Sequence, residues 1–286
     1  MLLFPFSNSV EGGAKDKRVK MRIVLFVNDS NFSFLLVKPL VEKFHASIIC
    51  SVFSNRIDNS IKRILNVFRD THYRYFVYRS YILLMTKINN FLHRNSVKSL
   101  CYKYSVNSKN ISDIKLLKNS RHLFPADIGI AINFDQIIPE EILNNFRIGV
   151  FNVHASRLPY DKGISPVLWA FARGEEKIWS TIYTMESKID TGDIYDQFTI
   201  PVEEKDTAFS LYNRVCTISG KQLEYVIEKV AFSNLGIIGR SETSEGNYLG
   251  WPNHEHLKMM RINKKKFISI RQVIDEFIQL KLRYFS

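Results

Sequence analysis

The sequence predicts an α/β fold: a Rossmann-like, mostly parallel sheet with helices on both faces. Two observations carry this prediction. Short uninterrupted apolar runs alternate with segments of helical periodicity, and 45% of the 286 residues are hydrophobic, which is enough for a sizeable core. Parallel strands covered by helices on both faces have this continuous apolar character. A basic helical insertion and a short C-terminal appendage complete the predicted architecture.

The first predicted elements form a β-α-β unit. An apolar strand covers 22–27 and ends at Asn28-Asp29, a helical pattern covers 34–44, and a second strand covers 46–53. No GxGxxG turn follows the first strand, so the ordinary dinucleotide fingerprint is absent. Residues 1–20 show no periodicity, and we expect a disordered extension there, with Met21 as a candidate true start.

Residues 56–103 differ from the rest because Lys and Arg far outnumber acidic residues and aromatic side chains are interleaved with them. We expect one or two amphipathic helices inserted into the core domain, which spans 21–232. One interpretation is a helix whose apolar face packs on the core and whose basic face is solvated. The other is a surface for nucleic acid or anionic lipid.

The alternation resumes after the insertion. The predicted elements are a strand at 128–133, a helix at 139–143, a strand at 148–153, a helix at 166–172 ended by Gly174, a strand at 180–185, a turn at 190–192, a strand at 193–200, and a helix from about 207 to 230 capped by Asp206. Residues 233–286 form the predicted appendage. It contains a glycine-bearing loop at 239–252, a Lys-rich strand at 264–270 and a closing helix.

The stretch FNVHASRLPYDKG, residues 151–163, ends an apolar strand on two polar side chains. Residues i and i+2 of a strand face the same side, about 7 Å apart. Asn152 and His154 therefore project together from the C-terminal end of a parallel strand, where open α/β sheets bind ligands. A lone histidine there is more often structural, but an amide is costly to bury unpaired, which favours a functional pair.

A carboxylate completes the set. Asp190 lies in the Gly-containing turn after the next strand, and adjacent strands bring it near His154. Asn, His and Asp suit attack of an amine on an acyl carbon. The amide donates to the tetrahedral oxyanion, the imidazole passes a proton to the leaving nitrogen, and the carboxylate orients the imidazole.

These residues resemble the folate-dependent formyltransferases. That family carries Asn-x-His, Pro-Ser-x-Leu-Pro, a following Gly and a distal Asp-Thr-Gly-Asp. The corresponding residues here are Asn152-Val-His154, Ala-Ser-Arg-Leu-Pro159, Gly163 and Asp190-Thr-Gly-Asp193. The Pro166-Val-Leu-Trp-Ala170 stretch and Gly174 also match. The chain departs from the family at Ala155, Asp161-Lys162, Trp179 and the 56–103 insertion, which concerns the acceptor rather than the chemistry.

The resemblance implies that Asn152, His154 and Asp190 are catalytic and that 10-formyltetrahydrofolate is the donor. It also implies that the backbone of 133–138 and the loop 188–192 cradle the pterin. The implied folate-binding residues are Asn133, Phe134, Gln136, Ile137, Ile138, Ile189, Thr191 and Gly192.

Other functions are less well supported. An aspartic protease needs two carboxylates sharing a proton, and the chain has a single Asp-Thr-Gly. We expect no metal site, because neither HExxH nor a Cys pair supports one; His254 and His256 lie in a polar tail and are expected to be solvated. A formyltetrahydrofolate hydrolase is less well supported, because members of that branch carry a small regulatory domain before the core and we expect only a short disordered extension at 1–20. An interaction module without catalysis would not need Asn152, His154 and Asp190 together.

The acceptor is the open part of the prediction. The net charge of +12 favours anionic partners. Methionyl-tRNA formyltransferases carry a β-barrel after the core, whereas about 55 residues follow the predicted core here. We therefore expect a small amine, a nucleotide-linked aminosugar, with methionyl-tRNA as the alternative. We also expect a cytoplasmic protein without stable membrane insertion, and a homodimer is left open.

Overall fold

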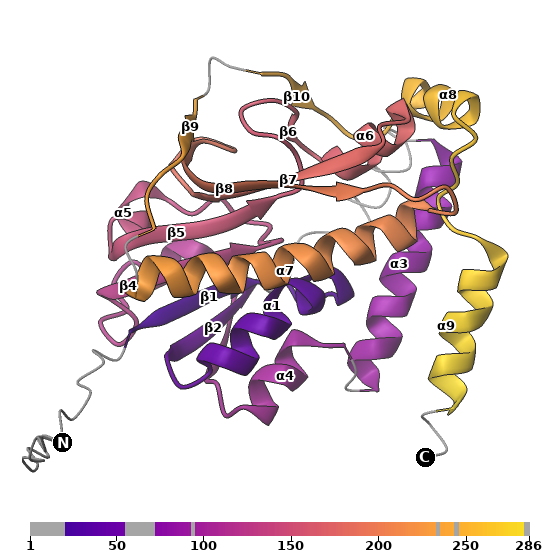
Figure 1. Ribbon diagram of the computed structural model, residues 1–286. Helices are drawn as coiled ribbons and strands as arrows, with labels where there is room; N and C mark the ends of the chain where they lie inside the picture. The colour runs from indigo at the N-terminus through magenta and orange to yellow at the C-terminus, as the bar shows by residue number, and fades with distance from the viewer. Residues whose placement is uncertain (1–20, 55–71, 93–94, 233–234, 243–245, 283–286) are drawn as a thin grey trace, which may run out of the picture.

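The computed structural model describes residues 21–54, 72–92, 95–232, 235–242 and 246–282 (Figure 1). The predicted extension, and the first part of the predicted insertion, lie outside these residues. The strands are β1 (Ile23–Val27), β2 (Ile48–Ser54), β3 (Ser108–Ile111), β4 (Ala126–Ile132), β5 (Phe146–His154), β6 (Lys162–Gly163), β7 (Lys177–Thr184), β8 (Gly192–Pro201), β9 (Gly239–Ser241) and β10 (Tyr248–Leu249). The helices are α1 (Asn31–Phe44), α3 (Tyr73–Phe91), α4 (Val97–Lys103), η1 (Ile114–Leu117), α5 (Glu140–Leu143), α6 (Pro166–Arg173), α7 (Ala208–Phe232), α8 (His254–Ile262) and α9 (Ile270–Leu282), where η1 is a 3₁₀ turn.

One eight-stranded sheet organises the described residues, in the order β3-β2-β1-β4-β5-β7-β8-β9. The pairs from β3 to β5 are parallel, as predicted. From β5 onward the pairs β5–β7, β7–β8 and β8–β9 are antiparallel. The predicted Rossmann-like α/β class is confirmed. After β5 the direction of the strands alternates, and of these described strands only β7 and β8 are joined by a short turn.

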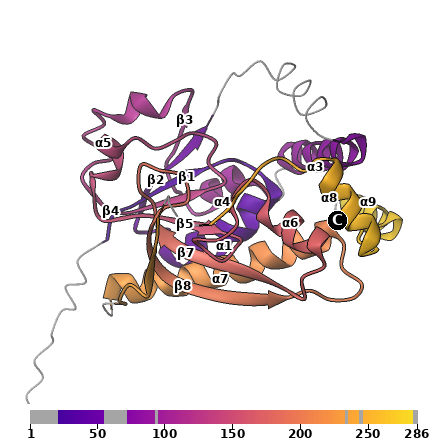
Figure 2. The ribbon, with the colours of Figure 1, turned by 90° about the horizontal axis from the view of Figure 1, so that it is seen from above.

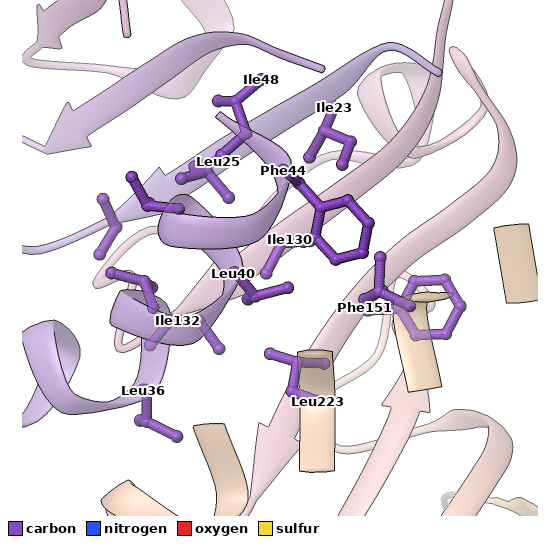
Figure 3. Packing of buried hydrophobic residues seen from close by; sticks show 14 of the residues in the cluster. Ile23, Leu25, Leu36, Leu40, Phe44, Ile48, Ile130, Ile132, Phe151 and Leu223 are labelled. Carbon is purple, nitrogen blue, oxygen red and sulfur yellow. The ribbon is translucent and has the colours of Figure 1, made fainter. Parts of the chain in front are cut away.

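Helices cover both faces of the sheet, as the apolar runs predicted. On β1, Ile23 and Leu25 point to the face covered by α1 and α7, while Val24 and Phe26 point to the opposite face. Figure 3 shows the first of these clusters, in which Leu40 and Phe44 of α1 meet side chains of β1, β4 and β5. Alternate residues of one strand therefore serve two separate cores.

The packing of α1 against α7 depends on a glycine. A Cβ added to Gly220 would lie 2.7 Å from the carbonyl oxygens of Leu35 and Leu36. No side chain fits there, so α7 approaches the backbone of α1 closely, and the two helices lie across the sheet side by side (Figure 1).

Helices α3, α6, α8 and α9 gather at one end of the sheet. Figures 1 and 2 both place α3, α8 and α9 at this end, beside α6. Their buried side chains, including Tyr75, Tyr78 and Met260, share a cluster with residues of α6 and with the N-terminal part of α7. Segments far apart in sequence, 72–92 and 254–268, therefore meet here.

Three predictions for the C-terminal half were wrong. Residues 264–270 form no strand; instead the carbonyls of Lys266 and Phe267 accept the first backbone N–H groups of α7, from Ala208 and Phe209. The first N–H groups of a helix have no acceptor inside that helix, and residues 266–267 supply one by running past the start of α7. The side chain that caps α7 is Thr207, which accepts from the Ser210 backbone N–H, rather than Asp206.

The third error concerns the polar tail. Residues 254–262 form helix α8, and His256 is fully buried, although His254 is exposed as expected. The His256 imidazole lies 2.8 Å from the Leu168 carbonyl through Nε2. Strands β3, β6, β9 and β10 were also not predicted, because each is four residues or shorter and lacks a clear apolar period.

Candidate active site

The candidate site lies at the C-terminal end of β5, the strand that has a parallel neighbour, β4, on one side and an antiparallel neighbour, β7, on the other. Asn152 and His154 end β5, and the register of the antiparallel pair places Tyr183 of β7 opposite Asn152. The turn between β7 and β8 then carries Asp190 back over the end of β5. The structure thus brings together all three side chains that the motif singled out.

His154 and Asp190 form the centre of the site. The imidazole Nδ1 lies 3.6 Å from the Asp190 Oδ1, and each side chain is about 10% exposed. On its other side, the His154 Nε2 lies 3.1 Å from the carbonyl oxygen of Asp161. Both neighbours are acceptors, so an imidazole protonated on both nitrogens has a partner for each proton.

The Asp190 carboxylate is fixed from two further directions. Its Oδ2 accepts the backbone N–H of Gly163 at 2.7 Å, and its Oδ1 accepts the hydroxyl of Tyr183 at 3.2 Å. The backbone of Asp190 has φ 54°, in the left-handed region, and its carbonyl accepts the Ser241 hydroxyl at 2.7 Å. The strained backbone and its several partners fix the direction of the carboxylate.

Tyr183 links the amide to the carboxylate. Its hydroxyl accepts the Asn152 Nδ2–H at 3.2 Å and donates to Asp190. The side chain is 1% exposed, and burial, together with the Asp190 carboxylate, raises the pKa of Tyr183 well above its ordinary value. The phenol therefore remains protonated and acts as a permanent donor to Asp190.

The Asn152 amide retains one donor for a ligand. Its Oδ1 accepts the backbone N–H of Val153 at 2.7 Å, and one of its two N–H groups donates to Tyr183. The second N–H is then available to a developing oxyanion. The contacts on either side fix the amide orientation, so that nitrogen rather than oxygen faces Tyr183.

Sequence reasoning missed Tyr183, Asp161 and Ser241. For Tyr183 a signal exists, because it lies on the predicted strand 180–185 next to the strand that carries Asn152. Only the pairing register reveals which residue of that strand faces the amide. Asp161 and Ser241 contribute through a backbone carbonyl and a distant strand, for which no local pattern exists.

The turn 188–192 is closed by its own hydrogen bonds. The Thr191 hydroxyl donates to the Lys188 carbonyl at 2.9 Å, and the Glu186 N–H donates to the Thr191 carbonyl at 3.1 Å. Gly192 has φ 137°, and a Cβ there would lie 1.7 Å from the Thr184 carbonyl oxygen. The turn therefore requires glycine, while Ile189 projects from it with 54% exposure.

The segment 133–138 follows β4 directly and lies beside the end of β5, because Ala131 pairs with Asn152. Asn133 has φ 49° and donates to the Ser33 hydroxyl at 3.1 Å. The Gln136 amide is engaged at both ends, accepting the Ile114 N–H at 2.7 Å and donating to the Ser54 hydroxyl at 2.8 Å. These side-chain contacts fix the conformation of the loop.

The apolar members of this segment divide into two groups. Phe134 packs on Phe26 with ring centroids 5.7 Å apart, and Ile138 is 2% exposed within the core. Ile137 is 68% exposed and, like Ile189 of the other loop, offers apolar surface to solvent. Two exposed isoleucines on the two loops suit the faces of a flat ring.

A cavity of about 660 Å³ lies elsewhere, between α3, α8 and the segment 264–268, and shares no residue with this site. Within the part of the chain that the structure describes, no group of three or more His, Cys, Asp or Glu side chains is arranged to hold a metal ion.

Comparison with known proteins identifies the domain that carries this geometry. Residues 86–227 match the formyl transferase family. A bifunctional polymyxin resistance protein ArnA from Wigglesworthia glossinidia brevipalpis is 40% identical over 123 residues, which are 43% of this chain and 19% of that protein. A methionyl-tRNA formyltransferase from Geobacillus thermodenitrificans is 34% identical over 119 residues, which are 42% of this chain and 37% of that protein. The chain thus spans less than half the length of either relative.

A solved structure shares the fold at lower identity. The N-formyltransferase from Helicobacter canadensis, in complex with folinic acid and dTDP-3-aminofucose, superposes with a TM-score of 0.51 and 14% identity over 80% of this chain and 71% of that chain. The family match covers β5, β7 and β8, the strands that position Asn152, His154 and Asp190. Residues 86–227, which carry this site, therefore form a domain similar to the formyl transferase family.

Proposed function

We propose that this protein transfers the formyl group of 10-formyltetrahydrofolate to the primary amine of an acceptor, with Asn152, His154 and Asp190 as the catalytic residues. The single observation that carries the proposal is the connected set at the end of β5. His154 lies 3.6 Å from Asp190, and Tyr183 joins that carboxylate to the Asn152 amide. This is an oxyanion donor, a proton carrier and an orienting carboxylate in one place.

In the proposed reaction the acceptor nitrogen attacks the formyl carbon, and a new C–N bond forms while the carbonyl becomes an oxyanion. The free N–H of Asn152 and the protonated His154 donate to that oxyanion. The bond from carbon to N10 of the folate then breaks, and N10 receives a proton through His154. The proton lost by the acceptor amine passes to Asp190 directly or through water, so no nucleophilic side chain is required.

The donor site is proposed to lie between the segment 133–138 and the loop 188–192. Ile137 and Ile189 supply exposed apolar surface for the pterin faces. Backbone groups of the two loops would meet the polar edge of the ring, with Phe134, Ile138, Thr191 and Gly192 holding the loops in place. Folinic acid, a formylated folate, is bound by the Helicobacter canadensis enzyme of the same fold.

For the acceptor we propose a nucleotide-linked aminosugar. The net charge of +12 favours an anionic acceptor. The 8% exposure of His154 admits a slender group such as a sugar amine, because Gly163 of β6 covers one side of the site and β10 pairs with β6. The solved relative in complex with dTDP-3-aminofucose is an example of this acceptor class.

A second candidate acceptor is methionyl-tRNA. It is favoured by the name of the Geobacillus thermodenitrificans relative, whose 34% identity exceeds that of the sugar-binding structure. The α-amine of a charged methionine is also slender, and the positive charge would attract RNA. The two acceptors require the same catalytic residues and differ only in what the surrounding surface must hold.

Acceptor profiling decides between them. Purified protein would receive 10-formyltetrahydrofolate with methionyl-tRNA or with dTDP- and UDP-linked aminosugars, and both tetrahydrofolate release and the formylated product would be measured. We expect one or more sugars to react with kcat/KM of about 10⁴ M⁻¹s⁻¹ or above. Formylation of methionyl-tRNA alone would replace our acceptor with the second candidate.

The control is Asn152→Ala, which removes the oxyanion donor and should lower kcat by roughly 10²-fold or more. Asn144→Ala changes the same residue type at the end of α5, outside the site, and should leave turnover near normal. If Asn152→Ala retained full turnover, the proposed chemistry would be wrong for every acceptor.

A further inference from the structure

Helix α3 has two apolar faces, of which only one is buried. Tyr75, Tyr78 and Ile82 pack in the cluster at the end of the sheet. The opposite side carries Tyr73, Val77, Leu84 and Phe91, which are between 51% and 83% exposed. Their spacing of four and then seven residues places them along one line of the helix. A helix that packs against the protein on one side requires only the buried apolar face, so the exposed one needs another explanation.

Helix α9 repeats this feature. Ile270, Ile274, Phe277 and Ile278 occupy positions i, i+4, i+7 and i+8, so they share one face. They are between 47% and 81% exposed, whereas Gln272, Val273 and Glu276 are the partly buried residues within 270–278. The apolar side of α9 is therefore directed largely to solvent rather than to the protein.

The α3 stripe borders a cavity that also reaches α9. The cavity of about 660 Å³ is lined by Tyr73 and Val77 of the α3 stripe and by Val273 of α9. Its deeper wall includes Met260 and Phe267. Cationic side chains lie among the lining residues, namely Arg74, Arg261, Lys264, Lys265 and Lys266. The cavity is therefore an apolar hollow among positive charges, next to the α3 stripe and in contact with α9.

The charge of this region is strongly one-sided. We call α3 together with residues 254–278 the end face. It contains nine Lys or Arg and three acids, Glu255, Asp275 and Glu276, which give a net charge of +6. Among the described ion pairs, its only one joins Arg271 to Asp275 within α9. The remaining cations are thus free of a carboxylate partner among those pairs and can attract an anionic surface.

We propose that the end face binds the surface of an anionic lipid bilayer. The apolar stripes of α3 and α9 lie at the boundary between headgroups and acyl chains, and the cations contact phosphate and other anionic headgroups. Within the described residues no helix is long and apolar enough to span a bilayer, so the binding is peripheral. The cavity accepts a lipid headgroup and the first part of an acyl chain.

Two other occupants fit the end face less well. A second copy of the chain would bring two surfaces of net charge +6 together across a symmetric interface, which opposes association. Nucleic acid would be attracted by the charge, and Tyr73, Phe91 and Phe277 offer rings to bases. Most of the exposed apolar residues are aliphatic, however, such as Val77 and Ile270, and these provide no stacking surface. Exposed aliphatic residues with flanking cations are the combination that a lipid surface uses.

Vesicle sedimentation tests the proposal. The full chain would be mixed with vesicles of phosphatidylcholine alone or with phosphatidylglycerol added. We expect binding to the anionic vesicles only, and we expect it to weaken as salt is raised, because salt screens the cations. Equal binding to both vesicle types, or binding to neither, would overturn the proposal.

Matched variants show whether the end face is responsible. Ile274→Ser with Phe277→Ser should lower the partition coefficient about tenfold or more, because each residue loses apolar burial. Ile237→Ser with Phe232→Ser makes the same changes at similarly exposed positions near the opposite end of α7 and should have no effect. Lys264→Ala should lower binding about fivefold, whereas Lys115→Ala, which removes an exposed lysine of η1 away from the end face, should not.

The remaining outcomes are separable. Melting temperatures show whether each variant is folded, and the vesicles contain no amine acceptor or folate, so the result is independent of the proposed catalysis. If the Ile274→Ser and Phe277→Ser variant instead lost self-association in sedimentation velocity, or lost RNA binding, while vesicle binding never occurred, the occupant would be a second copy or RNA and our proposal would be wrong.

Discussion

The candidate site and the end face differ in which side chains they bury: the site buries polar groups, and the end face exposes apolar ones. At the site, Asp190, His154 and Tyr183 are almost fully buried, and each has a partner within 3.6 Å. At the end face, large apolar side chains are exposed, while buried polar atoms such as the Tyr81 hydroxyl and the His256 Nδ1 lack a hydrogen-bond partner in the described residues. A rigid, preorganised network suits chemistry, whereas an uncovered apolar surface suits docking.

The largest effect is expected from Asp190→Asn at the site. The amide cannot hold a protonated imidazole as a carboxylate does, so we expect kcat to fall by roughly 10²-fold or more. Tetrahydrofolate release measures it. Asp127→Asn removes a carboxylate that binds Arg147 at the N-terminal ends of β4 and β5, away from the site, and should leave kcat nearly unchanged. A similar fall in kcat in both variants would mean that the loss does not depend on the hydrogen-bond network at the end of β5.

How far the sequence predicts each region follows from where its interactions come from. Asn152 and His154 were predicted to share a side because two residues of one strand do so by geometry. Their approach to Asp190 followed from strands that are neighbours in sequence. The role of Tyr183 needed the register of β5 against β7, which the apolar pattern of strand 180–185 does not specify.

The end face was harder to predict because its parts are distant in sequence. The basic character of 56–103 is visible in the sequence. The strand predicted at 264–270 is wrong, however, and a strand there gives no indication that Lys264 and its neighbours lie beside α3. The polar composition of 254–262 predicts that His256 is solvated. Its burial comes from packing against Leu168 and Trp169 of α6, and no local pattern signals that contact.

A second, smaller effect is expected from Tyr183→Phe. The ring still fills its buried position, but the Asn152 amide and the Asp190 carboxylate each lose a partner. We expect kcat to fall about tenfold with KM for the donor nearly unchanged, because the groups are misaligned rather than removed. A change in KM alone would indicate that Tyr183 acts on binding instead. Tyr195→Phe, a partly buried tyrosine of β8, serves as the control.

The turn that carries Asp190 should be sensitive to a single methyl group. Gly192→Ala places a Cβ against the Thr184 carbonyl in a backbone conformation with φ 137°. We expect a loss of at least about 2 kcal/mol in the free energy of unfolding, measured by urea denaturation. Gly236→Ala introduces the same methyl group into open space and should cost far less. Equal stability of the two variants would show that the turn adapts.

The smallest effect tests the end face through His256. Burial lowers the pKa of this imidazole from its ordinary value of 6.5, and the Leu168 carbonyl only partly opposes the shift. The neutral ring donates to that carbonyl through Nε2, while Nδ1 has no partner, so a second proton would be buried without an acceptor.

The sign of the resulting pH dependence follows from proton uptake. Because the pKa of His256 is lower in the folded state, the unfolded chain binds more protons as the pH falls below 6.5. Its contribution to stability is therefore complete above about 6.5 and is lost as the pH falls towards the pKa of the folded state. Each pH unit in that window removes at most about 1.4 kcal/mol. His256→Gln keeps a donor for Leu168 but does not titrate, so its free energy of unfolding should vary less between about pH 5 and 6.5 than that of the unmodified protein. Parallel pH profiles for the two proteins would mean that α8 opens to water at this position, and the end face would then be less firmly packed on α6 than its buried histidine indicates.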